Sequence, residues 1–384
     1  MTMPHEGSSA PWAEPPRRGR HSNRGIADRA RSAVFRGYRA LSGFGRRLGG
    51  IMHGTVAAVL IGLCIAGGLA LITVGVAKVG RPIAAVPQPG VGDAPPIGTF
   101  SHHPVVVTLP TRSESYVGAY AKGVPESYAP IEALSRATAA RLNVALYYSG
   151  WRERFRSAFA VEAGDHGAVP FIQIEPLRVS LTAIVAGVYD TYLETFATSV
   201  ASYGAKTGHA VIIGFGHEMN GYWYPWGYRR TSPAVFVAAW RHIVTVFRQQ
   251  GARNVTWLWT INIIDQRSGI RPPAAWWPGR SYVTWVGIDG YYLRRNWMFA
   301  SLFGPTIKAV RALTLAPVLI AETGAAPSSG QPAKIANLFA GIRAYGLLGF
   351  VWFDAPGTQD WILTGPAAKT EFGRGARTYQ ASAS

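Results

Sequence analysis

Short apolar runs alternate with amphipathic helical stretches from residue 116 onward. Helical patterns occupy 131–141, 181–207, 303–315 and 333–345. Eight runs have strand character: 116–120, 143–148, 169–174, 210–216, 255–261, 285–291, 317–322 and 349–353. Each run is apolar on both faces, as expected of parallel strands that are covered by helices. The pattern therefore predicts a repeated β/α unit.

The best-marked helix precedes the fifth strand. Thr231 or Ser232 can cap its N-terminus, Pro233 suits its first turn, and Gly251 ends it. Its apolar positions recur at helical spacing, so one face is expected to be buried.

Eight β/α units in about 260 residues fit a (β/α)8 TIM barrel, an α/β fold that usually needs about 250 residues. The segment 265–280 contains three Pro and two adjacent Trp, so the helix between the fifth and sixth strands is expected to be short or broken. A doubly wound open sheet is the alternative, but no glycine-rich phosphate loop follows the first strand.

The segments before the barrel predict a membrane anchor. Residues 55–77 are 23 residues without a charge, and Arg46, Arg47, Lys78 and Arg81 flank them. This length spans a bilayer core of about 30 Å, and signal peptides have shorter apolar regions. We therefore expect a basic, disordered cytoplasmic tail (1–53), an uncleaved transmembrane signal anchor (54–78), a Pro- and Gly-rich linker (79–112) and an extracytoplasmic catalytic domain (113–384).

The net charge of +18 does not by itself indicate a nucleic-acid partner. Residues 1–53 hold ten Arg and three acidic residues, which leaves +11 for the remainder. Because the basic tail adjoins the predicted span, the positive-inside rule explains it without a nucleic acid. Cys64 is the only cysteine, which excludes an intrachain disulfide and a thiolate metal cluster.

Polar residues gather where the predicted strands end. The fourth strand ends in His217-Glu218, the seventh in Glu322, the third in Glu175 and the sixth in Asp289. Catalytic residues of a barrel lie at these C-terminal ends, so Glu218 and Glu322 are expected to face each other across the mouth. Glycoside hydrolysis needs two such carboxyl groups.

A zinc helix is the alternative interpretation of His217-Glu218. The position four residues after His217 is Gly221, and the local pattern is that of a strand. We therefore predict no metal site and no cofactor.

Four segments carry a resemblance to a known family. Residues 217–227 (HEMNGYWYPWG) resemble the acid/base motif of glycoside hydrolase family 26, which comprises β-mannanases and some mixed-linkage β-glucanases. Residues 277–291, 317–324 and 350–353, the last followed by Asp360-Trp361, match in family order, so the resemblance covers about 116–375. Most related families have Asn before the acid/base, whereas this family has His, as here.

The resemblance implies catalytic and substrate-binding roles. Glu218 matches the general acid/base and Glu322 the nucleophile of a retaining mechanism. His217, Asn220 and Trp223 fall in the acid/base motif and are expected to bind substrate.

Further positions follow from the other segments. Tyr291 matches the tyrosine that hydrogen-bonds the nucleophile, with Tyr292 taking its place if the register shifts by one. Trp352 matches the aromatic floor under the sugar, and Glu175 fits a strand-three ending of the β-glucanase branch. The family usually has Asp-Trp-Arg after strand eight, but Ile362 follows Asp360-Trp361 here, so the substrate is not carried over.

The sequence thus predicts a membrane-anchored, extracytoplasmic, retaining endo-β-glycanase acting on a β-1,4-linked mannan or glucan. A transglycosylase that remodels an exported polysaccharide, working with synthesis or export machinery, would use the same residues. A catalytically silent carbohydrate-binding protein is the alternative outside enzymes.

Overall fold

The structure, a computed structural model, describes residues 105–382. Eight parallel strands close into a barrel in which each strand pairs with the next and β8 pairs with β1. The strands are β1 (Tyr116–Pro125), β2 (Val144–Gly150), β3 (Val169–Glu175), β4 (Val211–Phe215), β5 (Val255–Asn262), β6 (Trp285–Asp289), β7 (Val318–Thr323) and β8 (Gly349–Asp354). The predicted (β/α)8 barrel is confirmed.

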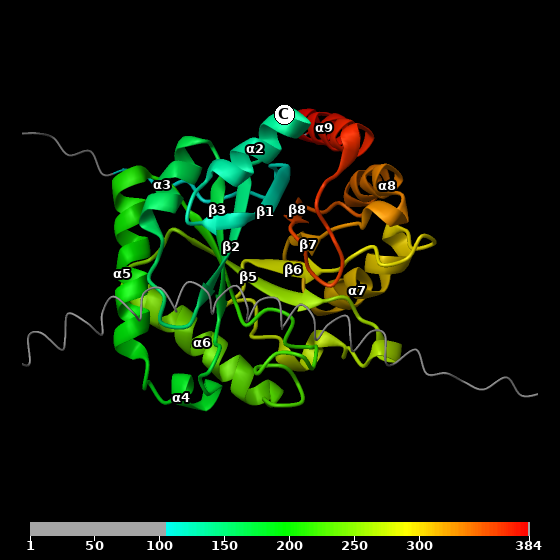
Figure 1. Ribbon diagram of the computed structural model, residues 1–384. Coiled ribbons are helices and arrows are strands. Elements are labelled where there is room, and N and C mark those ends of the chain that lie inside the picture. The colour runs from blue at the N-terminus through cyan, green and yellow to red at the C-terminus, as the bar shows by residue number, and fades with distance from the viewer. Residues whose placement is uncertain (1–104, 383–384) are drawn as a thin grey trace, which may run out of the picture.

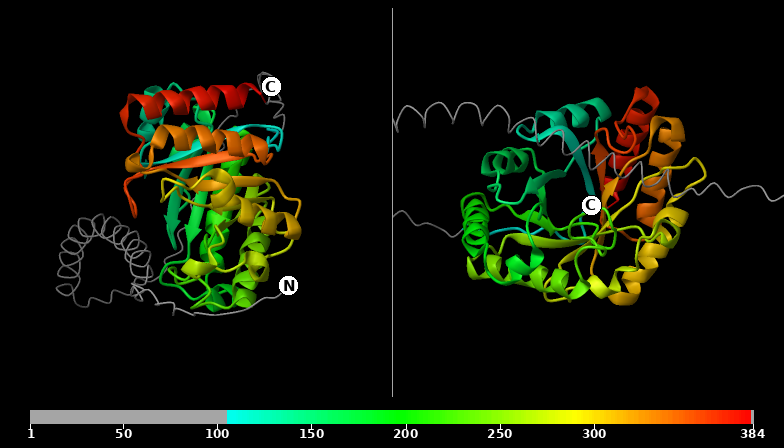
Figure 2. Two further views of the ribbon diagram at one scale, coloured as in Figure 1. Left: turned by 90° about the vertical axis from the view of Figure 1, so that its right-hand side faces the viewer. Right: turned by 60° about the horizontal axis from the view of Figure 1, so that its bottom comes forward.

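Helices surround the strands, as the view along the barrel shows (Figure 2, right). They are α2 (Ala129–Thr138), α3 (Ser157–Asp165), α4 (Leu181–Val185), α5 (Asp190–Thr207), α6 (Pro233–Gln249), α7 (Phe299–Leu313), α8 (Gln331–Ala344) and α9 (Gly365–Ala381). Three 3-10 turns are η1 (Gln266–Ser268), η2 (Pro273–Trp276) and η3 (Pro327–Ser329). The segment between β5 and β6 contains only η1 and η2, as its prolines predict.

The helix predictions hold best where capping is clear. Ser232 caps α6, because its hydroxyl accepts a hydrogen bond from the backbone N–H of Val235 at 3.4 Å and Pro233 follows it. The single helix predicted over 181–207 is wrong: Gly187, at φ 77°, makes a turn that separates α4 from α5. The patterns also miss α3 and α9, whose buried faces consist mainly of Ala and Gly and therefore show no strong apolar stripe.

Two apolar layers stabilise the barrel. The inner layer fills the barrel with side chains from alternate strand positions, among them Leu146, Phe171, Leu258, Trp285 and Val351. The outer layer lies between the strands and the helices and takes the intervening positions. This alternation decides which residues at each strand end reach the barrel mouth.

The predicted tail, span and most of the linker lie outside the described residues. No helix in residues 105–382 is long and apolar enough to cross a membrane. The anchor therefore remains a prediction from the sequence.

Candidate active site

The mouth of the barrel is formed by residues that continue the inner layer toward the C-terminal strand ends. They lie two or four positions beyond the inner-layer residues: Tyr148, Gln173, Glu175, Thr260, Asn262, Asp289 and Phe353. The Tyr120 ring packs against those of Tyr148 and Phe353, with centroids 5.3 and 4.6 Å apart. Carboxyl groups and aromatic rings thus share one enclosed space.

Glu322, on β7, is held by two tyrosines. The hydroxyl of Tyr148 donates to its Oε1 at 2.6 Å, and that of Tyr291 donates to its Oε2 at 2.7 Å. The pKa of Glu322 is raised to about 8, because burial and, next, the charge of Glu218 raise it more than the two hydrogen bonds lower it. The tyrosines therefore favour the ionised carboxylate in a site that otherwise disfavours it.

An irregularity in β7 places Glu322 in the mouth. Leu319 and Ala321 belong to the inner layer, so regular alternation would direct Glu322 outward. The register shifts between Ile320 and Thr323 where β7 pairs with β8. Such an irregularity re-aims a side chain, and it turns Glu322 toward Tyr148.

Glu218 lies just beyond the end of β4 in a left-handed conformation, with φ 57°. Its backbone N–H donates to the carbonyl of Thr260 at 3.0 Å, and its carbonyl accepts from Gly221 at 2.8 Å. A non-glycine residue in this region costs about 1–3 kcal/mol, so the surrounding contacts must enforce it. The tip of β4 therefore fixes the direction of this carboxyl group.

Both oxygens of the Glu218 carboxyl group are engaged. The indole N–H of Trp223 donates to Oε2 at 2.6 Å, and the amide of Asn262 donates to Oε1. Only 8% of Glu218 and 6% of Glu322 is exposed, so both groups are largely shielded from water.

His217 is buried behind Glu218. Its Nε2 lies 2.9 Å from the Tyr224 hydroxyl, and burial lowers its pKa to about 3, so the ring is neutral. Tyr224 stacks on Trp226 with centroids 4.4 Å apart, and the Trp226 indole donates to the carbonyl of His217. This group is a rigid support for the end of β4.

Asp289 is the third buried carboxyl group of the mouth. It pairs in register with Glu322 and is fully buried, and no side chain in residues 105–382 donates a hydrogen bond to it. Burial raises the pKa of Asp289 well above its ordinary value, and the charges of Glu322 and Glu218 add to this. These surroundings favour the protonated form of Asp289.

Five of the residues singled out in the sequence gather at the mouth. Trp223 contacts Glu218, Tyr291 contacts Glu322, and Glu175 is close enough that its charge raises the pKa of Glu322. The alternative to Tyr291 is excluded: Tyr292 is fully buried and packs against Phe303 of α7.

Three residues expected to bind substrate are buried, and their contact with a sugar stays a prediction. Trp352 is fully buried, donates to the carbonyl of Trp361 at 3.1 Å and packs against Phe372 of α9, because its position on β8 faces the helices. Asn220 is also fully buried, and its amide bonds the backbone of Asn262 and Arg271. His217 is 1% exposed, and its ring lies 5.7 Å from that of Tyr148, measured between centroids.

The sequence reasoning missed Tyr148, Asn262 and Phe353. Tyr148 and Phe353 end strands that were predicted, and counting alternate positions from the barrel interior would have found them. Asn262 lies one residue beyond the predicted end of the fifth strand, and no local motif marks it.

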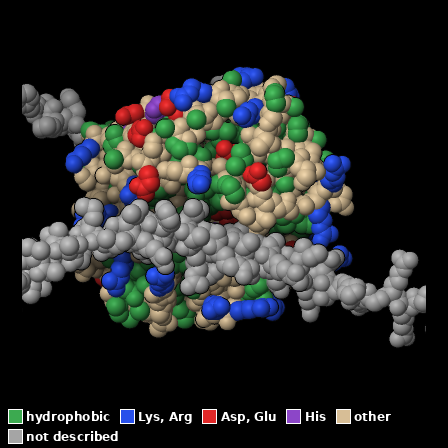
Figure 3. Space-filling view, viewed as in Figure 1, with side chains coloured by type: hydrophobic (Ala, Val, Ile, Leu, Met, Phe, Trp, Pro, Cys, Tyr) green, Lys and Arg blue, Asp and Glu red, His purple; other side chains and the backbone are tan. Residues whose placement is uncertain are grey.

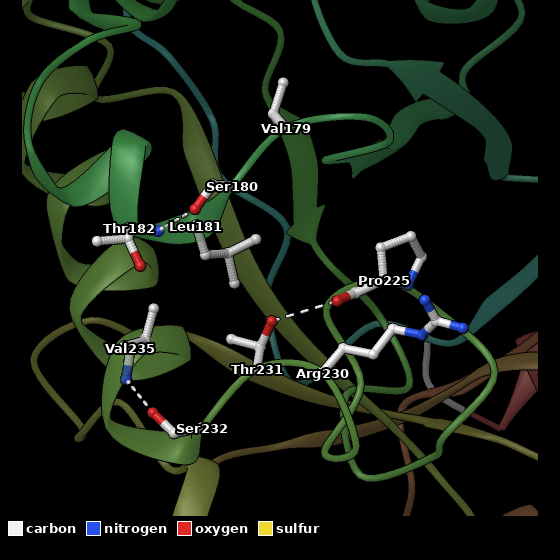
Figure 4. Close-up of a pocket in the computed structure, with 9 residues that line it drawn as sticks. All are labelled: Val179, Ser180, Leu181, Thr182, Pro225, Arg230, Thr231, Ser232 and Val235. Atoms are coloured by element: carbon white, nitrogen blue, oxygen red, sulfur yellow. Dashed lines mark hydrogen bonds between the residues drawn. The ribbon is translucent and has the colours of Figure 1, made fainter.

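A separate hollow of about 230 Å³ lies between the connection after β3 and the start of α6 (Figure 4). It is lined by Val179, Ser180, Leu181, Thr182, Pro225, Arg230, Thr231, Ser232 and Val235. Among the described residues, no group of three or more His, Cys, Asp or Glu could hold a metal ion.

Comparison with known proteins agrees with this geometry. The model of glycosyl hydrolase family 26 matches residues 187–333. Endoglucanase H of Acetivibrio thermocellus is 28% identical over 263 residues, which are 64% of this chain but only 28% of endoglucanase H. The chain thus spans little more than a quarter of that relative.

Solved structures show the same fold at low identity. The catalytic domain of a family 26 endo-β-1,4-mannanase from a Bacillus species (JAMB-750) superposes with a TM-score of 0.55 at 13% identity, covering 72% of this chain and 92% of that one. A family 26 β-mannanase from Bacteroides ovatus gives 0.53 at 16% identity, covering 70% and 90%.

Proposed function

We propose that this chain, which belongs to glycoside hydrolase family 26, is a retaining endo-β-glycanase that cleaves a β-1,4-linked mannan or glucan. The observation that carries the proposal is the pair of buried carboxyl groups, Glu218 and Glu322, each held by its own donors at one barrel mouth. The names of the relatives, an endoglucanase and β-mannanases, support the substrate class.

In the proposed first step, Glu322 attacks the anomeric carbon while Glu218 gives its proton to the departing glycosidic oxygen. The glycosyl–enzyme ester is then hydrolysed by a water whose proton returns to Glu218. Tyr148 and Tyr291 favour the ionised form of Glu322 that the attack requires, since the hydrogen bonds they donate lower its pKa.

The amide of Asn262 can serve Glu218 in both protonation states. Its N–H donates to Glu218, which suits the carboxylate that remains after proton transfer. A half-turn of the amide would present the carbonyl oxygen, which accepts a hydrogen bond from the protonated acid. By this rotation Asn262 could hydrogen-bond Glu218 both before and after the proton transfer.

We further propose that residues 54–78 anchor the enzyme and hold the barrel on the extracytoplasmic side. The support is the uncharged run 55–77 with basic residues before it. Anchoring also keeps the transglycosylase alternative open, because a tethered enzyme is well placed to remodel an exported polysaccharide beside its synthesis machinery.

The test replaces each carboxyl group by its isosteric amide. Glu218→Gln and Glu322→Gln should each lower turnover of soluble glucomannan at least about a thousandfold, since each removes a group needed in the transition state. The matched control is Glu194→Gln, on the exposed face of α5, which should keep normal turnover.

Product analysis separates the alternatives. Retention requires that the first-formed reducing sugar is the β-anomer in proton NMR, and products longer than the starting oligosaccharide would indicate transglycosylation. Near-normal turnover in either amide variant contradicts the proposal. Binding of glucomannan without product would favour the silent binding protein.

A further inference from the structure

The connections at the end of the barrel that carries the site are rich in arginine. At this end, the connections that follow β2 to β6 hold ten Arg and three acidic residues. The Arg are Arg152, Arg154, Arg156, Arg178, Arg229, Arg230, Arg267, Arg271, Arg294 and Arg295. The segments at the opposite end, before the strands, hold Arg112, Arg141, Arg253 and Arg280. Basic side chains lie along the lower, upper and right margins of the molecule in Figure 3, which has the same orientation as Figure 1.

These arginines are not neutralised by carboxylates. Within residues 105–382, Arg156 is the only one of the ten that forms an ion pair, with Glu126 at 3.4 Å. Several stack on aromatic rings instead: Arg229 lies 4.5 Å from the ring centroid of Tyr222 and Arg271 lies 5.0 Å from that of Tyr228. Stacking holds a guanidinium in place and leaves its N–H groups available to a ligand.

Arg229, Tyr222, Tyr228 and Arg271 form one arginine–tyrosine cluster. The two tyrosine rings meet edge to face at 6.5 Å. Both arginines are exposed, whereas both tyrosines are partly buried. The cluster therefore presents two positive charges to solvent from an ordered base.

The arginine–tyrosine cluster is joined directly to the acid side of the site. The ring of Tyr222 contacts that of Trp223 at 5.3 Å, and Trp223 donates to Glu218. Asn220 fixes the backbone of Arg271 with two hydrogen bonds. The N–H of Arg271 donates to the main-chain carbonyl of Asn220 at 3.0 Å, and the side-chain amide of Asn220 donates to the carbonyl of Arg271 at 3.1 Å. The Arg229 guanidinium is thus connected through the rings of Tyr222 and Trp223 to the group that would protonate the leaving sugar.

We propose that the substrate is an acidic polysaccharide, one that carries carboxylate groups on its sugars, and that the arginine–tyrosine cluster binds a carboxylate on the leaving-group side. This inference rests on the proposed function, because it names the substrate class of the same site. A guanidinium matches the geometry of a carboxylate by donating two parallel hydrogen bonds, and the uncompensated charge draws an anionic polymer to the mouth. Arg230, next in the chain, lines the separate hollow shown in Figure 4 together with several hydroxyl groups.

The experiment compares two forms of one polymer on the full-length chain. Soluble glucomannan is the neutral probe, and glucomannan with its primary alcohols oxidised to carboxylates is the acidic probe. We expect a higher kcat/KM on the acidic form at low ionic strength. Raising the salt to 1 M should remove most of the preference, because the Debye length falls to about 3 Å.

The diagnostic variant is Arg229→Gln/Arg271→Gln. It should lower the ratio of acidic to neutral kcat/KM by about three- to tenfold, the range expected for two exposed charge pairs. The control, Arg141→Gln/Arg253→Gln, removes the same charge from the opposite end of the barrel and should leave the ratio unchanged.

The outcomes separate this inference from the proposed function. Equal or better hydrolysis of the neutral polymer by the wild-type chain overturns the inference and leaves the proposed function intact, whereas failure to cleave either polymer contradicts the proposed function. An equal fall in the ratio in both double variants would show a general charge effect and overturn the role of the cluster.

Discussion

Replacing Tyr148 by Phe removes one of the two hydrogen bonds to Glu322 and leaves the ring in place. The hydroxyl lies 2.6 Å from Oε1, and its hydrogen bond lowers the pKa of Glu322, which is nevertheless raised to about 8, mainly by burial. A hydrogen bond to a charged group contributes about 1.5–3 kcal/mol. Since 1.36 kcal/mol corresponds to one pKa unit, Tyr148→Phe should raise the pKa of Glu322 by about one to two units.

The expected consequence is a loss of activity that higher pH partly restores. In the proposed mechanism Glu322 must be ionised to attack, so raising its pKa lowers the reactive fraction at pH 7 by about ten- to a hundredfold. The acid limb of the kcat/KM profile should move to higher pH by the same one to two units. A dinitrophenyl β-glycoside suits the measurement, because its leaving group departs without a proton and the limb then reports Glu322 rather than Glu218.

The matched control is Tyr147→Phe, one residue earlier on β2. Tyr147 faces the helix layer and donates no hydrogen bond to Glu322 or Glu218, so the same deletion there should leave the profile in place. Two results would refute the conclusion that Tyr148 lowers the pKa of Glu322. One is a kcat/KM of Tyr148→Phe that stays within a factor of two of the wild-type value at each pH, and the other is an acid limb that moves to lower pH.

Three further predictions follow from other contacts. Phe353→Ala should raise KM by about three- to tenfold in steady-state kinetics, because it removes an aromatic surface from the mouth. Trp352→Phe should leave KM unchanged and lower only the melting temperature measured by calorimetry. Lys334→Met should cost about 2 kcal/mol in urea unfolding, because the amine donates to the carbonyls of Arg295 and Trp297 at 2.6 and 2.5 Å. Burial lowers the pKa of His217 to about 3, so its ring must stay neutral in the folded state. Its contribution to the free energy of unfolding is present above pH 6.5 and is lost as pH falls toward 3. Between pH 7 and pH 5, the free energy of unfolding of His217→Asn, measured in urea, should therefore fall by about 2 kcal/mol less than that of the wild type.

The barrel could be predicted because its strands and its best-capped helix are marked by residues that are close together in the sequence. Each strand is a short apolar run, and the best-capped helix, α6, carries Ser232 and Pro233 at its start. The break at Gly187 and the helices α3 and α9 were less accessible, because Ala- and Gly-rich faces bury well once a neighbour is present but form no apolar stripe beforehand.

The site residues also fall into those that the sequence could predict and those that it could not. Glu218 and Glu322 stand at strand ends and could be named from position, and Tyr291 could be named from its motif. The contacts of Tyr148 and Asn262 could not, since they depend on strands that are distant in sequence and adjacent only in the closed barrel.

Side-chain direction was the hardest property to predict. Trp352 was placed under the sugar because its motif matched, yet strict alternation along β8 turns it toward α9. Glu322 is the opposite case: alternation alone would turn it outward, and the register shift in β7 brings it to the mouth. A motif locates a residue along the chain, whereas strand register decides which face it reaches.

The left-handed backbone of Glu218 limits which residues are stable at this position. At φ 57°, Gly or Asn would relieve the backbone strain but would remove the carboxylate that accepts hydrogen bonds from Trp223 and Asn262. Glu218 therefore carries a backbone cost that a need for a carboxyl group explains. The conformation of one residue thus weighs against the silent binding protein, independently of any motif.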